Sequence, residues 1–204
     1  MLSPRMDAKW SLQVEGEVVS ADVRALSGRH RDGSVRAVYV RFQYPLRRGD
    51  RARARLTLEV LPKSGREVSA PSVDVPGFPE AVALPVSPAY LISTDLVGPT
   101  LPVQDTRRLG REWDRYESDF VKWSEFHWTK YGVDWAAGNY YDRVAVYYAW
   151  WVRTGNAEYW RRATLMALDY RTRYLEPNNY GSSLYWAQLE GLALHYLLTG
   201  DAAS

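Results

Sequence analysis

A helix-ending tripeptide of the form Thr-Gly-Asn/Asp occurs twice in the second half of this 204-residue chain. Thr154-Gly155-Asn156 and Thr199-Gly200-Asp201 lie 45 residues apart, and each follows a proline-free segment that contains alanine and tyrosine. Glycine is favoured just after the last turn of a helix, and Asn or Asp is favoured at the start of the next one. The same offset aligns Tyr140 with Tyr185, Tyr141 with Trp186, Val144 with Leu189 and Trp151 with Tyr196. Periods of this length are typical of repeated helical hairpins.

This repeat predicts helices over 140–153, 157–174 and roughly 184–198, of which the first two form an αα-hairpin. A single hairpin cannot bury its apolar face, so several are expected to stack. The sequence stops at Ser204, where the next partner helix is expected to begin. We therefore expect either a fragment of a longer protein or a helical core completed by a homo-oligomer or a larger assembly.

The first part of the chain follows the period of β-strands. Polar and apolar residues alternate strictly over 51–60 and again around 10–14, while 34–44 is rich in Val, Tyr and Phe between turn residues. We expect 34–44 and 51–60 to pair through a turn at 47–50, within a small antiparallel β-sandwich or barrel. The predicted fold class is therefore α+β.

Proline is dense between residues 70 and 102, where seven prolines occur. This density predicts a connecting segment of short extended pieces without a helix. Apolar residues such as Leu91 and Ile92 predict that the segment packs on another part of the chain. We expect a β domain over 1–104, with the connecting segment from about 70, and a helical repeat domain over 105–204 that is apparently truncated.

The charge of the chain is nearly balanced, at +2, with +4 over residues 1–110 and −2 over 111–204. Nucleic acid is therefore not an expected partner. The arginines at 47, 48, 51, 53 and 55 leave two interpretations open, a solvated strand face and an anion-binding strip.

The sequence has no cysteine, no recognisable signal peptide and no apolar run of membrane-spanning length. Without cysteine there are no disulfides, thiolate metal sites or cysteine nucleophiles. The N-terminus has no basic region followed by an apolar core, and no apolar run approaches the roughly 18 residues of a membrane span. We expect no signal peptide and no membrane partner. The location stays open, with an extracellular or virion-associated protein among the options.

Three segments of the helical part resemble the hairpins of (α/α) toroid carbohydrate-active enzymes, a group that includes glycoside hydrolases and polysaccharide lyases. They are 138–143 (GNYYDR), 153–160 (RTGNAEYW) and 191–201 (GLALHYLLTGD). The segment 31–36 (RDGSVR) looks like a turn before a strand in the N-terminal β domain of exo-rhamnogalacturonan-lyase-like proteins. The resemblance implies a β domain followed by the opening hairpins of an (α/α) toroid, and a carbohydrate ligand.

Tryptophan and tyrosine are concentrated in the helical part, with 8 of 9 Trp and 12 of 15 Tyr after residue 110. Sugar rings stack their C–H faces on aromatic rings, while their hydroxyls need polar neighbours. The candidate substrate-binding residues are Trp135, Asn139, Tyr140, Tyr141, Arg143, Asn178, Asn179, Trp186 and Gln188. Packing between helices is the alternative interpretation, above all for Tyr147, Tyr148, Trp150 and Trp151. The aromatic residues near Asn139 and Asp142 are expected to lie in loops.

Two catalytic chemistries use residue types found here. Glycoside hydrolysis needs two carboxylates, and Asp142 and Glu190 begin neighbouring repeat helices. A helix-dipole partner and an exposed or ion-paired helix residue are their ordinary alternatives. A lyase needs a base such as His127 or Tyr131, with amide or guanidinium groups near the developing charge.

The three histidines have no metal-ligand spacing, so neither a metal nor a cofactor is expected. His195 lies among apolar helix residues and is expected to be packed. The sequence favours a carbohydrate-active protein, lyase-like or glycoside hydrolase-like, that binds a polysaccharide or oligosaccharide in an aromatic-lined cleft. The alternative is a non-catalytic structural or glycan- or receptor-binding module of a phage particle or another surface assembly.

Overall fold

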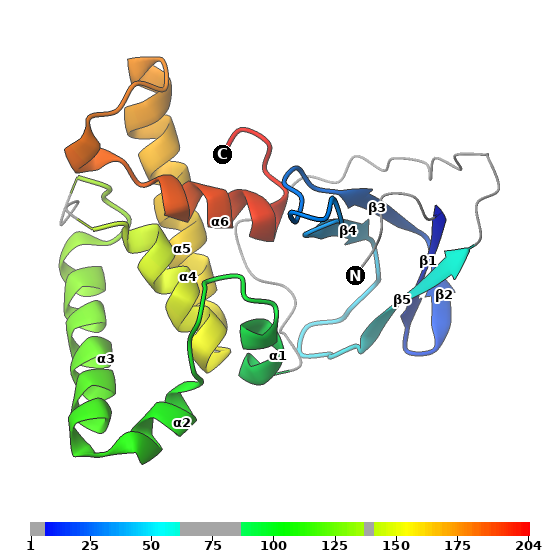
Figure 1. The fold of residues 1–204 in the computed structure, drawn as a ribbon, viewed down its shortest axis with the longest axis horizontal. Coiled ribbons are helices and arrows are strands. Elements are labelled where there is room, and N and C mark those ends of the chain that lie inside the picture. Colours follow the sequence, from blue (N-terminus) through cyan, green and yellow to red (C-terminus); the bar gives the residue numbers. More distant parts are fainter. Residues whose placement is uncertain (1–6, 62–86, 137–140) are drawn as a thin grey trace. The chain divides into compact units, whose positions relative to one another are not determined.

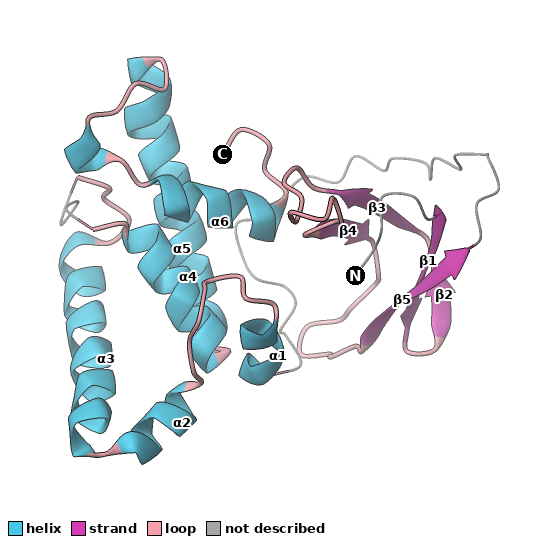
Figure 2. Ribbon diagram, in the orientation of Figure 1, coloured by secondary structure: helices cyan, strands magenta, loops and turns pink. Residues whose placement is uncertain are grey.

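A computed structural model describes residues 7–61, 87–136 and 141–204 of the chain (Figure 1). The chain separates into two compact units, Met1–Gly77 and Phe78–Ser204. Its class is α+β, as predicted, with antiparallel sheets in the first unit and helices in the second (Figure 2).

The first unit contains two small antiparallel sheets. One has the strand order β2-β1-β5 and the other pairs β3 with β4. The strands are β1 (Asp7–Val14), β2 (Glu17–Val19), β3 (Ala21–Ala25), β4 (Val38–Phe42) and β5 (Ala54–Leu61). Leu12 and Val14 of β1 are buried, together with Leu26, as the alternation around 10–14 predicts. Within the described residues neither sheet closes on itself.

The predicted pairing between 34–44 and 51–60 is wrong. β4 pairs with β3, and β5 pairs with β1 along eight residues, with Leu12 opposite Leu56. The turn at 47–50 does form, because the backbone N–H of Asp50 donates to the carbonyl of Arg47 over 3.0 Å. The strands on either side of this turn, β4 and β5, do not pair with each other. Alternation shows that a segment has one buried face, but it does not identify the strand that will pair with it.

The second unit contains six α-helices in its described residues. They are α1 (Pro88–Ser93), α2 (Val103–Thr106), α3 (Arg111–Tyr131), α4 (Arg143–Thr154), α5 (Ala157–Tyr170) and α6 (Leu189–Thr199). Shorter turns connect them: 3₁₀ turns at Arg107–Leu109, Glu176–Asn178 and Leu184–Trp186, and a π-helical segment at Arg171–Leu175.

Helix α1 contradicts the prediction that the proline-rich segment excludes a helix. Pro88 occupies the first turn of α1, where the missing N–H of proline has no intrahelical partner to lose. The Ser87 side chain caps the helix by accepting the backbone N–H of Tyr90. Leu91 is buried in the core of the unit and Ile92 packs against it, so the predicted packing of this segment is confirmed. The remaining predictions for 62–86 lie outside the described residues.

The two tripeptides of the repeat form the same structure. Gly155 and Gly200 have φ values of 71° and 72°, in the left-handed region that closes a helix. Their backbone N–H groups donate to carbonyls four residues earlier, over 2.7 and 2.8 Å. The hydroxyls of Thr154 and Thr199 also donate four residues back and accept the N–H two residues ahead. The two predicted helix ends are thus confirmed, and they share the same hydrogen bonds.

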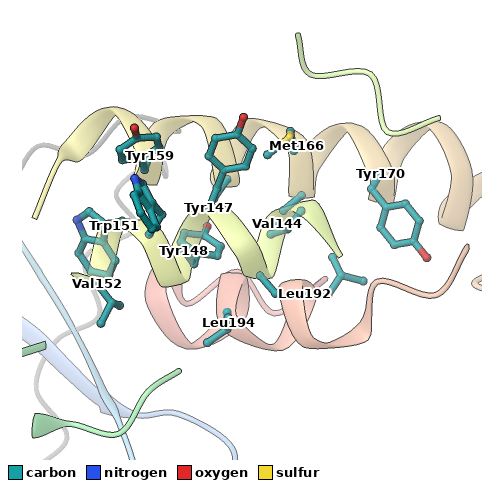
Figure 3. Packing of buried hydrophobic residues seen from close by; sticks show 14 of the residues in the cluster. Val144, Tyr147, Tyr148, Trp151, Val152, Tyr159, Met166, Tyr170, Leu192 and Leu194 are labelled. Atoms are coloured by element: carbon teal, nitrogen blue, oxygen red, sulfur yellow. The ribbon is translucent and has the colours of Figure 1, made fainter. Parts of the chain in front are cut away.

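Helix α4 lies between α5 and α6 and provides more of the buried core residues than any other helix (Figure 3). Its buried rings are Tyr147, Tyr148, Trp150 and Trp151. Two of them contact Tyr159 of α5, and the other two contact Trp160. Leu192 and Leu194 of α6 complete the cluster. The packing interpretation of these four α4 rings is therefore confirmed.

Two of the predicted helices end or begin elsewhere. The segment 157–174 is α-helical to Tyr170 and continues as the π-helical turn, whereas the helix expected from 184 begins at Leu189. The rings between Trp123 and Tyr131 lie on α3, a helix of 21 residues whose bounds within the helical part, 105–204, were not predicted from the sequence. Their charged neighbours mask the apolar stripe of α3, so its helical period is weak in the sequence.

Candidate functional site

Asp142 joins the beginnings of α4 and α6. Its side chain is the N-cap of α4 and accepts the backbone N–H of Ala145 over 3.0 Å through Oδ1. Oδ2 accepts the backbone N–H of Gly191, in the first turn of α6, over 2.7 Å. Both carboxylate oxygens therefore accept backbone hydrogen bonds at helix N-termini, where negative charge is stabilised.

Gly191 allows the two helices to approach this closely. A Cβ at Gly191 would lie 2.5 Å from the Cβ of Val144 and closer still to Oδ1 of Asp142. These distances are shorter than packed carbon atoms allow. The first turns of α4 and α6 consequently lie side by side.

Burial raises the pKa of Asp142 above its ordinary value, and the negative charge of Glu190 adds to the increase. The two backbone hydrogen bonds act in the opposite direction. Glu190 itself is exposed in the first turn of α6. The two predicted carboxylates thus lie near each other, but that of Asp142 already accepts hydrogen bonds as a helix cap.

Beside these helix ends, three half-buried rings form a cluster. Trp135 stacks on Tyr174, with ring centroids 4.2 Å apart and planes inclined by 27°. Trp186 contacts Trp135 edge to face, with ring centroids 6.5 Å apart. Tyr170 supports the cluster from below the surface, since its buried hydroxyl donates to the carbonyl of Trp186 over 2.7 Å.

The π-helical segment after α5 helps to place these rings. It separates Tyr170 from Tyr174 by one turn and leaves both rings against Trp135. π-helical turns are rare and occur frequently at functional sites. Sequence reasoning did not include Tyr170 or Tyr174 among the candidates, although their spacing of four residues places both on one helix face.

Polar groups surround the ring cluster. The Asp169 carboxylate accepts the backbone N–H of Trp135 over 3.0 Å and pairs with Arg173 at 3.4 Å. Arg173 also lies 4.0 Å from Asp134, and both of these side chains reach solvent. The side-chain amide of Asn178 donates to the carbonyl of Tyr174 over 2.7 Å. Half-buried rings with charged and amide groups around them have the composition that a sugar ligand requires.

Two further rings project into solvent at the same helix ends. Tyr141, before α4, is 71% exposed, and Tyr185, before α6, is 76% exposed. We call Trp135, Tyr141, Tyr174, Tyr185 and Trp186 the aromatic end of the helical unit. Tyr141 and Trp186 are equivalent positions in the 45-residue repeat.

The other predicted binding residues have different environments. Arg143 is buried and donates to the carbonyls of Asp134 and Gly132, so it fixes the loop that carries Trp135. Gln188 is buried at the N-cap of α6. Asn179 is exposed in a left-handed conformation after the 3₁₀ turn. Asn139 and Tyr140 lie outside the described residues.

The predicted lyase residues His127 and Tyr131 are neighbours on α3, with ring centroids 5.5 Å apart. Among the described residues, no hydrogen bond, ion pair or ring contact joins either of them to Asp142 or Glu190. The four catalytic candidates therefore form two separate pairs.

In the described part of the chain, no group of three His, Asp or Glu side chains is arranged to hold a metal ion. None of its helices is long and apolar enough to cross a membrane. No protein-family model matches the sequence, and neither the curated proteins nor the solved structures give a significant match.

Proposed function

We propose that the helical unit is a glycan-binding module and that its ligand binds at the aromatic end. The observation that carries this proposal is the stacked pair of Trp135 and Tyr174 with the edge of Trp186, all half-buried beside charged groups. Rings fixed by packing bind a sugar face with little loss of side-chain entropy. Exposed Tyr141 and Tyr185 would extend the contact, and Arg173 and Asn178 would meet the hydroxyls.

The proposal includes the architecture implied by the resemblance. The identical hydrogen bonding after α4 and α6 supports a repeat of helical hairpins such as an (α/α) toroid contains. The finer assignment of the first unit as a β-sandwich or barrel is part of the same proposal. A non-catalytic glycan- or receptor-binding module of a surface assembly would use this site in the same way.

The test is a titration of the full chain with a panel of neutral and uronate-containing oligosaccharides. We expect saturable binding that weakens about tenfold in Trp186→Ala and in Tyr141→Ala, which corresponds to about 1.4 kcal/mol each. Tyr90→Ala is the matched control, because Tyr90 is a 59% exposed tyrosine on α1. Absence of binding across the panel, or equal weakening in the control, would contradict the proposal.

Glycoside hydrolysis is the second candidate, and the raised pKa of Asp142 beside Glu190 favours it. Asp142 would donate the proton and Glu190 would act as base or nucleophile. Glu190→Gln separates the two candidates, because Glu190 is exposed and no hydrogen bond of its side chain holds the fold together among the described residues. A hydrolase loses turnover in this variant while it keeps glycan affinity. A binding module has no turnover to lose.

A further inference from the structure

Helix α3 presents aromatic rings to solvent that the aromatic end does not include. Four of its rings are each about half exposed, at 49–56%: Trp113, Tyr116, Trp123 and Phe126. The inward side carries buried Glu117 and Ser124, with Phe120 stacked on Trp150 at 3.9 Å. The exposed rings are therefore not part of the hydrophobic core.

The exposed rings of α3 support one another in two separate edge-to-face pairs. Trp113 contacts Tyr116 at 6.4 Å, and Trp123 contacts Phe126 at 5.8 Å between ring centroids. From the second pair the contacts continue through His127 to Tyr131. The C-terminal half of α3 therefore carries a continuous row of ring contacts that the pair at Trp113 does not join.

The two halves of α3 differ in charge. In the N-terminal half, Asp114 pairs with Arg107 at 3.4 Å and Asp119 with Arg115 at 3.6 Å. In the C-terminal half, the Arg162 guanidinium of α5 donates two hydrogen bonds to the Glu125 carboxylate, over 2.7 and 2.9 Å.

Two lysines of the C-terminal half lie over the exposed rings. The ammonium of Lys122 lies 5.1 Å from the Trp123 centroid, and that of Lys130 lies 5.7 Å from Phe126 and 4.9 Å from Tyr131. Among the described residues neither lysine makes an ion pair. The C-terminal half of α3 thus combines exposed rings with uncompensated positive charge.

We propose that the C-terminal half of α3 binds an anionic polysaccharide, with sugar rings on Trp123 and Phe126 and acidic groups at Lys122 and Lys130. An anionic polysaccharide offers both stacking faces and negative charges along an extended chain. This inference takes its ligand class from the proposed function and assigns a second, separate surface. The acidic group is either a carboxylate or a sulfate, and both would pair with an ammonium.

Two other occupants agree less well with the charges. A two-fold contact between copies of this half would bring the lysines of both copies together, at a cost in repulsion. An anionic membrane along the helix would meet Glu112, Asp114 and Asp119 near the N-terminal rings. A polysaccharide can occupy the C-terminal half alone.

The experiment titrates the full chain with oligogalacturonate, chondroitin sulfate and neutral malto-oligosaccharides, at low and at high salt. We expect the anionic probes to bind, with affinity that falls as salt rises. Trp123→Ala and the double variant Lys122→Gln/Lys130→Gln each weaken this binding about tenfold. Trp113→Ala, an equally exposed Trp in the charge-balanced half, changes it less than twofold. A preference for galacturonate identifies a carboxylate ligand, and a preference for chondroitin sulfate identifies a sulfated one.

Several results would overturn the inference. They are unchanged affinity in both α3 variants, equal affinity for the neutral probe, binding to anionic lipid vesicles alone, and a dimer in sedimentation that Trp123→Ala dissociates. Melting temperatures of the variants confirm that each is folded. If Trp186→Ala abolishes binding while the α3 variants do not, the inference fails and the proposed function stands. If only the α3 variants weaken binding, the proposed function fails and the inference stands.

Discussion

The buried rings of α4 and the half-exposed rings of the aromatic end differ in how they are held. Tyr148 and Trp150 are almost fully buried and contact rings of neighbouring helices, so the free energy of unfolding depends on them. Trp135 stacks on Tyr174, and Trp186 meets Trp135 edge to face. A backbone group of each tryptophan is hydrogen-bonded, and each ring keeps part of its surface in water. Similar side chains in one compact unit thus have different expected roles, stability for one set and ligand contact for the other.

The largest effect is expected in the buried set. Tyr148→Ala should lower the free energy of unfolding by about 3–5 kcal/mol, because it leaves a cavity at a fully buried ring. Tyr148→Phe should cost only about 1–2 kcal/mol, through the lost hydrogen bond to Thr164 (2.9 Å). Urea unfolding measures both. A loss below 1 kcal/mol for Tyr148→Ala would show that this ring does not belong to the core.

A buried histidine should make stability depend on pH. Burial lowers the pKa of His195 to about 4 from 6.5. The negative charge of Asp201 raises this pKa, and the positive charge of Arg171 lowers it further. Between these values the unfolded chain binds a proton that the folded chain does not, so stability is full above pH 6.5 and falls toward pH 4. The loss should reach about 3 kcal/mol, at about 1.4 kcal/mol per pKa unit.

His195→Gln is the control for this pH dependence, since glutamine does not titrate and can still hydrogen-bond to the Ser204 hydroxyl, which lies 2.8 Å from Nδ1 of His195. Urea unfolding at pH 7 and pH 4.5 should differ less in this variant than in the wild type. An equal difference in both proteins would assign the effect to other groups.

A substitution at Gly191, where α4 and α6 meet, should lower the free energy of unfolding by an intermediate amount. Gly191→Ala places a methyl group against Val144 and Asp142, and overpacking of this kind costs about 1–3 kcal/mol. Because the change forces α6 away from α4, it should also weaken glycan binding at the aromatic end. Thermal melting and the glycan titration measure the two effects, and a normal affinity in a destabilised variant would separate the junction from the site.

The smallest change in stability is expected at the exposed rings. Tyr185→Ala should alter the free energy of unfolding by less than about 0.5 kcal/mol, as surface substitutions usually do. Its glycan affinity should nevertheless fall. If Tyr185→Ala destabilises the protein as much as Tyr148→Ala does, the distinction between the two ring sets is wrong.

The sequence predicted the ends of α4 and α6 well because the signals at those ends are local. Gly155 and Gly200 end helices through their own left-handed backbone, and Asn156 caps the next helix with its own side chain. The pairing of β4 with β3 could not be predicted in this way, since strand partners are chosen by contacts distant in sequence. The prediction for α1 failed for a different reason: proline density predicts a segment without a helix, whereas Pro88 in the first turn begins one.

The candidate site was predictable only in part. The excess of Trp and Tyr located it in the helical half, where Trp135 and Trp186 do contact each other and Tyr141 is exposed directly before α4. The double cap formed by Asp142 was not visible, because the N–H of Gly191 comes from a helix 49 residues away. The four solvent-facing rings of α3 are exposed and those of α4 are buried. The spacing of aromatic residues along a helix does not predict which of the two environments a ring will have.

The central claim is that the half-exposed rings bind glycan and the buried rings do not. Indole N–H resonances of the tryptophans, assigned by single Trp→Phe variants, follow each ring separately during a glycan titration. The account predicts saturable shifts for Trp135 and Trp186, with the signals of Trp150 and Trp151 unchanged. Shifts at Trp150 and Trp151 without shifts at Trp135 and Trp186, or no shift with any glycan, would contradict it.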